Sequence, residues 1–175
     1  MTATVCEIPG ALIWRAKSSF QRYVATLPDG VCELSSDIDF LGTGTFAFPL
    51  GEVDADTNEL RFRGAVTFRG HADLLMVPIA NPSLQWVRDR WELSCGADLT
   101  ASDRFVLAIS RRAEQVAPGI LRFRPILAPD GVFLFGGTYP AGEPLDDLVV
   151  QLESTAGLPD GSVEIPRVGS SCGAP

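Results

Sequence analysis

Three side chains that are rare in this sequence carry most of its potential for chemistry. His71 is the single histidine, and Tyr23 and Tyr139 are the two tyrosines, in a chain with 10 phenylalanines. An ionised phenol is a hard anionic oxygen that suits ferric iron, and tyrosine is the axial haem ligand in catalase. A histidine hydrogen-bonded to the phenol oxygen favours its ionised form. These residues therefore suggest one shared site, against the commoner outcome of a tyrosine with a satisfied hydroxyl and an unrelated histidine.

Most other catalytic signatures are absent from the sequence. It contains no GxSxG, Walker, GxGxxG or HExxH pattern, and its cysteines lack the CxxC spacing of a metal site. The stretch GTGTF at residues 42–46 is better explained as a turn that enters a strand. Asp146 and Asp147 are adjacent, so their carboxylates point differently and we interpret them as loop residues. The cysteines are interpreted as scattered small apolar residues: Cys6, Cys32, Cys95 and Cys172.

The stretch WRAKSSFQRYVATLPDG, residues 14–30, predicts the element that carries Tyr23. Apolar residues recur there at spacings of three and four, which is the period of an amphipathic helix. The closing LPDG supplies a proline and a glycine, which end helices. Phe20 and Tyr23 then share one face. The apolar positions of this predicted helix are Ile13, Ala16, Phe20, Tyr23, Val24 and Leu27.

After this helix the sequence becomes a series of short strands separated by Gly, Pro, Asp and Asn. The clearest is LRFRGAVTF, in which alternate residues from Leu60 to Phe68 face the core while Arg61 and Arg63 face water. The sequence therefore predicts a mainly β fold of antiparallel sheets, sandwich or barrel-like, with one or two short helices that include the N-terminal one.

The placement of the other two rare residues depends on strand parity. In GVFLFGGTY, Phe133, Phe135 and Tyr139 share a parity, which predicts an aromatic face on a late strand if no bulge intervenes. Strict alternation from Phe68 would put His71 on the wet face of its strand. A glycine bulge at Gly70 would shift the alternation and turn the imidazole to the core face, which is a hypothesis that an unbroken strand over residues 66–73 would contradict.

Composition indicates one acidic globular domain. Apolar residues make up 46% and charged residues 21% of the chain, and the net charge is -8. That charge disfavours nucleic acid and anionic membranes as partners. The sequence has no secretory leader pattern and no apolar run long enough to insert in a membrane, so we expect a cytoplasmic protein. We expect residues 1–152 to form the β domain and residues 153–175, rich in Gly, Pro and Ser, to be loosely ordered.

Three stretches, taken in order, resemble the HtaA-type haem-binding domain, a family of haem-uptake modules in Gram-positive bacteria. They are LIWRAKSSFQRYV, LRFRGAVTFRGHADLLMVPIANPSLQ and FGGTYPAGEPLDDL, and the resemblance runs from about Leu12 to Leu152. Their shared patterns are W...SF..Y, F.G.V.F.GH...L....NP and YPAG...D. Two positions depart from the family pattern: Thr138 replaces an aromatic residue, and Asp147 stands where a proline is usual.

The resemblance implies an antiparallel β fold that binds one haem b. Carried over residue by residue, it makes Tyr23 the axial ligand of the iron, with His71 hydrogen-bonded to its phenol and Tyr139 near the porphyrin. Ser19 and Phe20, which flank Tyr23 in the matching motif, become pocket residues.

Two functions of different classes follow from the sequence. The first is a haem-binding carrier, buffer or sensor that holds ferric haem through Tyr23. The second is a cyclase- or isomerase-like enzyme that keeps the apolar pocket without haem and acts on a hydrophobic metabolite, with the same three polar groups as donors or acid and base. The partner is accordingly haem or another hydrophobic small molecule.

Overall fold

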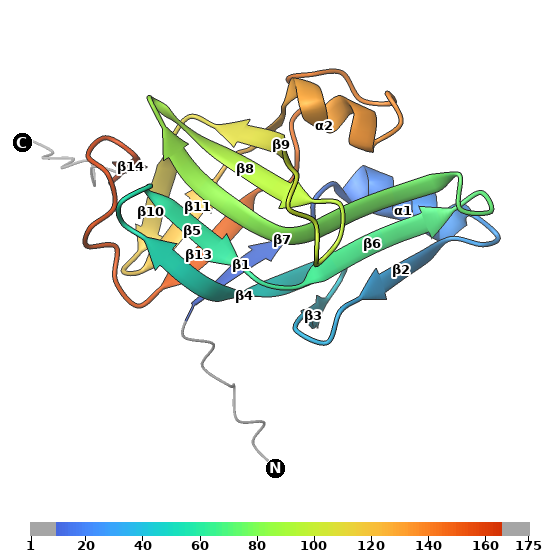
Figure 1. The fold of residues 1–175 in the computed structure, drawn as a ribbon, viewed down its shortest axis with the longest axis horizontal. Coiled ribbons are helices and arrows are strands. Elements are labelled where there is room, and N and C mark those ends of the chain that lie inside the picture. The colour runs from blue at the N-terminus through green and yellow to red at the C-terminus, as the bar shows by residue number, and fades with distance from the viewer. Residues whose placement is uncertain (1–9, 166–175) are drawn as a thin grey trace, which may run out of the picture.

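The computed structural model describes residues 10–165, which form a mainly β structure with two short helices (Figure 1). The predicted fold class is therefore confirmed. The helices are α1 (Ser18–Thr26) and α2 (Pro129–Leu134). The strands are β1 (Gly10–Trp14), β2 (Val31–Leu34), β3 (Asp39–Gly42), β4 (Thr45–Asp54), β5 (Glu59–Phe62), β6 (Ala65–Gly70), β7 (Leu75–Val87), β8 (Arg90–Gly96), β9 (Arg104–Ser110), β10 (Ala113–Ala117), β11 (Ile120–Phe123), β12 (Ile126–Leu127), β13 (Leu148–Leu152) and β14 (Val163–Glu164).

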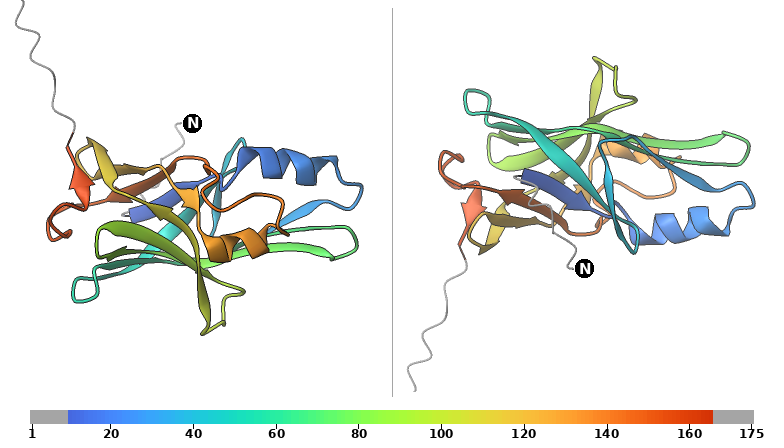
Figure 2. Two further views of the ribbon diagram at one scale, coloured as in Figure 1. Left: turned by 90° about the horizontal axis from the view of Figure 1, so that it is seen from above. Right: turned by 90° about the horizontal axis from the view of Figure 1, so that it is seen from below.

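The strands form one continuous sheet that curls around the interior, as two further views show (Figure 2). Its order is β12-β9-β8-β7-β5-β4-β1-β13-β11-β10-β14, with β6 and β2 attached beside β7 and β3 beside β4. Described neighbours are antiparallel except β10 and β14, which are parallel. In Figure 1, α1 lies at the end of the molecule away from β14, and α2 lies above it on the upper edge. The curl lets residues from both ends of the sheet and from both helices share one apolar core.

The first part of the expected helix is a strand. Ile13 belongs to β1, which pairs with β4 on one side and β13 on the other. Ala16 has a left-handed backbone with φ 61°, and α1 begins only at Ser18. The prediction was wrong at Ile13 and Ala16 because a central, largely buried strand is apolar at successive positions, so helical spacings arise in it by chance. The predicted end is confirmed, since α1 stops at Thr26, just before LPDG.

The alternation over residues 60–68 is confirmed, but it spans two strands. Gly64 separates β5 from β6 and has a φ of 105°, a backbone conformation that residues with a side chain rarely adopt. A Cβ at this position would also lie 2.5 Å from Ile38 Cδ1. The inward residues remain on the core side across the break: Leu60, Phe62, Val66 and Phe68 are all buried.

The stretch at residues 131–139 is not a strand. Residues 129–134 form α2, and turns follow through residue 139. Pro129 lies in the first turn, where its missing N–H costs nothing, and Asp130 adds a carboxylate at the positive end of the helix. The predicted common face of three aromatic residues is therefore wrong: Phe133 is 82% exposed, whereas Phe135 is buried. A short apolar run fits either type of element, and here the flanking proline favoured the helix.

The C-terminal segment expected to be loose is described as far as residue 165. It includes β14, which pairs with β10. The carbonyl oxygen of Ser162 accepts a hydrogen bond of 2.9 Å from the Trp91 indole in the core. The division of the chain at residue 152 stays a prediction.

Several smaller expectations can be placed on the fold. GTGTF is the turn that leads from β3 into β4, with positive φ at Gly42, Thr43 and Gly44. Cys95 is buried as expected of a small apolar residue, but Cys32 is exposed, and Cys6 and Cys172 lie outside the described residues. Neither described helix is long and apolar enough to cross a membrane.

Candidate functional site

The phenol of Tyr23 and the imidazole of His71 meet at the surface of the molecule. Tyr23 lies on α1 and His71 follows β6, and the distance from Tyr23 Oη to His71 Nε2 is 2.5 Å. Both side chains are exposed, Tyr23 to 45%. At this separation the imidazole either accepts the proton of the phenol or donates a hydrogen bond to a phenolate. The structure thus brings together the two residues that the sequence placed in one site.

His71 is directed toward α1 by a tight turn. The pairing of β6 with β7 is regular up to Gly70, so the hypothesis of a glycine bulge is wrong. The strand ends at Gly70, and residues 71–74 form a turn closed by the Leu74 N–H, which donates to the His71 carbonyl oxygen. Gly70 has another role: a Cβ there would lie 2.5 Å from Leu27 Cδ1, so its absence lets the end of α1 approach the strand.

Tyr139 reaches the same helix from the loop after α2. Its hydroxyl lies 3.4 Å from the Ser19 hydroxyl, and either group can donate. Ser19 precedes Tyr23 by four residues, so both lie on one face of α1. The Tyr139 ring packs edge-on against Phe135, with ring centroids 5.7 Å apart. The three rare residues are therefore gathered along α1, although Tyr139 comes from a loop and not from the predicted strand.

Phe20 lies on the core side of α1, whereas Tyr23 is exposed, so the prediction that the two share one face is wrong. Phe20 is 4% exposed, and its ring packs edge-on against Phe68 of β6 and Phe135, with centroids 5.4 and 5.1 Å away. Edge-on aromatic pairs favour one orientation beyond their burial alone. Phe20 thus fixes α1 against both segments that supply the other polar groups.

A partly buried polar contact that sequence reasoning missed fixes the start of α1. The Ser18 N–H donates to Asp146 Oδ1 at 3.1 Å, and the Ser18 hydroxyl donates to the other oxygen of that carboxylate. Lys17 donates to Glu143 at 2.9 Å and lies 4.7 Å above the Tyr139 ring. Lys17 is the only lysine of the chain, and that rarity was the one available signal. These contacts join the Tyr139 loop to the helix that carries Tyr23.

We expect Asp146→Ala to destabilise the fold by about 1–2 kcal/mol, because it removes the carboxylate that satisfies the N-terminus of α1. Urea denaturation followed by circular dichroism measures the change. Asp147→Ala is the matched control, since Asp147 is the exposed neighbour and makes no hydrogen bond from its side chain to a described residue. Equal losses of stability in the two variants would contradict the role of Asp146 at the N-terminus of α1.

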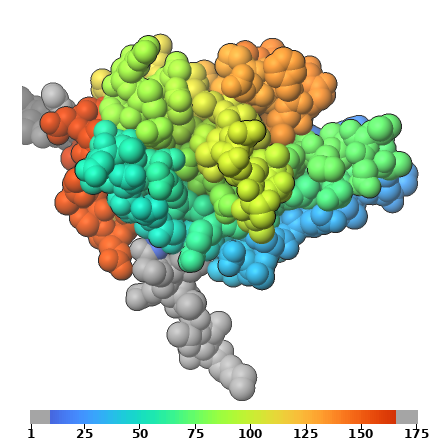
Figure 3. Space-filling model, in the orientation of Figure 1, coloured from blue at the N-terminus to red at the C-terminus, as the bar shows by residue number. Residues whose placement is uncertain are grey.

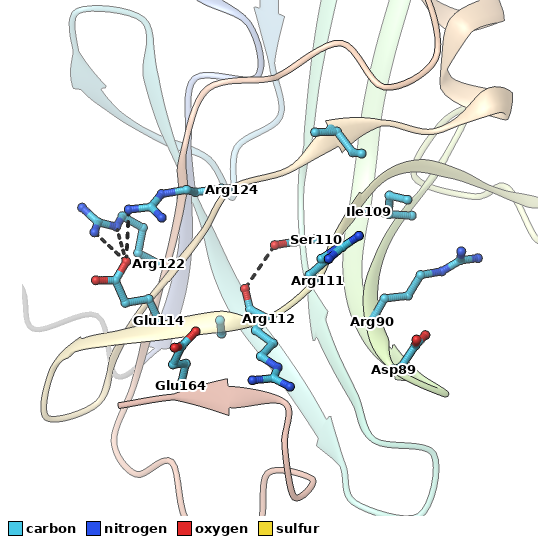
Figure 4. Close-up of a pocket in the computed structure, with 12 residues that line it drawn as sticks. Asp89, Arg90, Ile109, Ser110, Arg111, Arg112, Glu114, Arg122, Arg124 and Glu164 are labelled. Atoms are coloured by element: carbon cyan, nitrogen blue, oxygen red, sulfur yellow. Dashed lines mark hydrogen bonds and ion pairs between the residues drawn. The ribbon is translucent and has the colours of Figure 1, made fainter. Parts of the chain in front are cut away.

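A charged cleft lies away from α1 (Figure 4). It has a volume of about 1180 Å³ between β8, the β9–β10 turn and β11, and none of its lining residues belongs to the site on α1. Glu114 forms ion pairs with Arg122 at 2.6 Å and Arg124 at 3.3 Å, so these two guanidinium groups share one carboxylate. The pKa of Glu114 is lowered by the hydrogen bond from Arg122. Such a cleft is poorly suited to an apolar ligand.

A family match covers the part of the chain that contains the residues of the site on α1. Residues 9–151 match the family model HtaA, described as Htaa. The chain belongs to the HtaA family. The resemblance inferred from the three sequence stretches is thereby confirmed, and the HtaA match spans every residue of the site on α1.

Solved structures of HtaA domains share this fold. The N-terminal domain of HtaA from Corynebacterium glutamicum is 23% identical, with a TM-score of 0.67 over 83% of this chain and 97% of that one. The C-terminal domain of the same protein is 24% identical, with a TM-score of 0.65 over 81% and 93%. The heme binding protein HtaB from the same organism is 17% identical, with a TM-score of 0.66 over 81% and 90%. No curated protein matches the chain.

The two departures from the HtaA pattern lie on the surface. Thr138 is exposed in the loop before Tyr139, and its N–H donates to the Phe135 carbonyl oxygen at 3.3 Å. Asp147 is exposed beside Asp146. The contacts that join the Tyr139 loop to α1 are made by other side chains, so neither Thr138 nor Asp147 takes part in them through its side chain.

Proposed function

We propose that this chain binds ferric haem b, with the Tyr23 phenolate as axial ligand and His71 hydrogen-bonded to it. The observation that carries the proposal is the 2.5 Å contact between an exposed phenol and an imidazole. A hydrogen-bonded partner that favours the phenolate makes it a better ligand for ferric iron. Membership of the HtaA family and the likeness to the heme binding protein HtaB support the same ligand.

The donor set around Tyr23 suits a metalloporphyrin better than a bare metal ion. Within residues 10–165, no group of three or more His, Cys, Asp or Glu side chains is placed to hold a metal. A porphyrin supplies its own ring nitrogens and takes only axial ligands from the protein, a role that tyrosine fills. The residues present therefore fit haem.

The segments around the site also expose apolar side chains. Leu74, in the turn that begins with His71, is 91% exposed, and Phe133, on the helix that precedes the Tyr139 loop, is 82% exposed. In the space-filling view, α2 and the β6–β7 end project on the same side of the molecule, with a shallow notch between them (Figure 3). Burial of apolar surface by a flat ligand would contribute roughly 25 cal/mol per Å².

The residues of the chain divide the work of binding. Tyr23 provides the anionic oxygen, and His71 either accepts the phenol proton or donates a hydrogen bond to the phenolate. The Ser19 and Tyr139 hydroxyls lie at the other end of the same face of α1 and would line the pocket there. The bound haem would supply a ferric iron centre and a large apolar ring. Because the phenol stands at an accessible surface, we propose a carrier, buffer or sensor.

The enzyme alternative and the location of the protein stay predictions. A site for turnover of a hydrophobic metabolite needs an enclosed, mostly apolar pocket. The cleft described above is charged, and the Tyr23–His71 pair is exposed. Haem binding is therefore the better supported of the two functions, and a cytoplasmic location remains an expectation from the sequence.

Titration of the purified protein with hemin tests the proposal. We expect a saturable shift of the Soret band at a stoichiometry of about one haem per chain, as a single axial site requires. Two reference titrations show the spectrum of hemin that is not bound at a specific site. One uses buffer without added protein, and the other uses a heat-unfolded sample of the same chain. A linear, non-saturating change would contradict haem binding.

His71→Asn tests the imidazole separately from the phenol. Asparagine tolerates the left-handed backbone found at His71, with φ 54°, but its side chain is too short to replace the imidazole. We expect haem affinity to fall about tenfold, which corresponds to about 1.4 kcal/mol for one charge-assisted hydrogen bond. Because Tyr23 remains, the absorption spectrum should still be that of a tyrosine-ligated ferric haem. Unchanged affinity would show that His71 does not act on the ligand.

A further inference from the structure

The turn that presents His71 has an uncommon backbone. His71, Ala72 and Asp73 have φ values of 54°, 52° and 66°, so three successive residues with side chains adopt the left-handed conformation. Such residues persist only where surrounding contacts fix them, and they are concentrated at functional sites. The question is which contact fixes this turn.

The carboxylate of Asp29 supplies that contact. The His71 N–H donates to Asp29 Oδ1 at 3.1 Å, and the Ala72 N–H donates to Asp29 Oδ2 at 2.6 Å. Asp29 belongs to LPDG, which follows the end of α1. The segment that ends the helix of Tyr23 therefore also holds the turn of His71.

We propose that Asp29 is a positioning residue that sets the imidazole of His71 against the phenol of Tyr23. The two partners lie on separate elements, α1 and the β6–β7 hairpin, and a contact of 2.5 Å tolerates little relative movement. Asp29 joins those elements at the point where the pair forms. Its effect on haem rests on the function proposed above, whereas its effect on the pair does not.

The ionisation of Asp29 agrees with this role. The N–H groups of Ala72 and His71 lower the pKa of the Asp29 carboxyl, and the charge of the His71 side chain lowers it further. At neutral pH the two hydrogen bonds are therefore made to a carboxylate, which strengthens them. Arg69, just before the turn, is paired with carboxylates other than Asp29: with Glu33 at 2.9 Å and with Asp73 at 3.4 Å.

The first experiment uses Asp29→Asn in the protein without haem. Asparagine has nearly the same shape but offers only one acceptor oxygen, so one of the two N–H groups loses its partner. We expect the nuclear Overhauser effect between the Tyr23 and His71 rings to weaken strongly and the His71 and Ala72 amide resonances to shift. Asp103→Asn removes the same charge at an exposed position whose side chain makes no hydrogen bond or ion pair with a described residue, and it should leave these signals unchanged.

A double-variant cycle then tests the link to the ligand. We expect Asp29→Asn to weaken hemin binding about tenfold, in the range typical of residues that orient a metal ligand. In the His71→Asn background the same change should have no further effect, because Asp29 acts through His71. Additive losses in the cycle would overturn the proposal.

The two experiments separate the possible failures. If the unaltered protein does not bind hemin, the ring-to-ring contact in the haem-free protein still tests Asp29. If Asp29→Asn lowers the melting temperature but keeps that contact, Asp29 only stabilises the end of α1 and the proposal is wrong. Asp29→Ser, which also leaves a single acceptor, provides a second variant with the same expected loss.

Discussion

Tyr23→Phe should abolish most haem binding. The change removes only the phenol oxygen, which is the proposed axial ligand, and leaves the ring and the helix in place. We expect hemin affinity to fall at least roughly 100-fold, or about 2.7 kcal/mol. Spectrophotometric titration of the purified variant measures the change, together with circular dichroism to show that the fold is intact.

Tyr139→Phe is the matched control for this prediction. It removes the other phenol oxygen of the chain, whose contact with the Ser19 hydroxyl is a long 3.4 Å. Because this oxygen is not the proposed ligand, we expect affinity to change by no more than about threefold, which corresponds to less than 1 kcal/mol for a weak neutral hydrogen bond. A larger loss of affinity in Tyr139→Phe than in Tyr23→Phe would show that Tyr23 is not the axial ligand.

Phe20→Ala should be among the most destabilising single changes in the chain. The Phe20 ring is buried between Phe68 and Phe135, so its removal leaves a cavity and breaks two edge-on aromatic contacts. Truncation of a buried phenylalanine typically costs about 3–5 kcal/mol of the free energy of unfolding. Urea denaturation with a constant m-value provides the measurement.

Phe133→Ala is the corresponding control. The Phe133 side chain is 82% exposed on α2, so its truncation creates no cavity and should change the free energy of unfolding by less than about 0.5 kcal/mol. If Phe20→Ala costs less than about 1 kcal/mol, α1 is not anchored through Phe20. The same variant should also lose haem affinity, because the helix that carries Tyr23 would no longer be fixed against β6.

The site residues that could be predicted from the sequence belong to rare residue types and lie in motifs that occur in a fixed order. Tyr23, His71 and Tyr139 stand out because the chain has so few histidines and tyrosines. Their motifs, in sequence order, match those of a known domain family. The strict alternation from Leu60 to Phe68 likewise predicted which residues face the core, since burial on one face of a strand imposes a period of two.

The parts that were missed depend on contacts between distant segments. Asp146 and Lys17 act across the fold, and no local pattern shows that the Tyr139 loop returns to the start of α1. The direction of His71 was attributed to a bulge at Gly70, whereas it follows from a turn held by Asp29. In each case a polar side chain satisfies the backbone or a charge of another element, which sequence periodicity does not reveal.

Local ambiguity accounts for the two wrong element assignments. Ile13 lies in a central strand whose apolar positions also fit helical spacing. The residues before Tyr139 form a short helix because Pro129 and Asp130 favour a helix start, although the apolar run itself is equally compatible with a strand. The first error moved the start of the helix and the second mistook a helix and loop for a strand, but Tyr23, His71 and Tyr139 still lie along α1.

The most direct test of the central claim is the electron paramagnetic resonance spectrum of the ferric haem complex at neutral pH. Coordination by the Tyr23 phenolate predicts a high-spin ferric signal that is retained in Tyr139→Phe and lost in Tyr23→Phe. A low-spin signal typical of nitrogen ligands, or a high-spin signal that persists unchanged in Tyr23→Phe, would contradict coordination through this phenol.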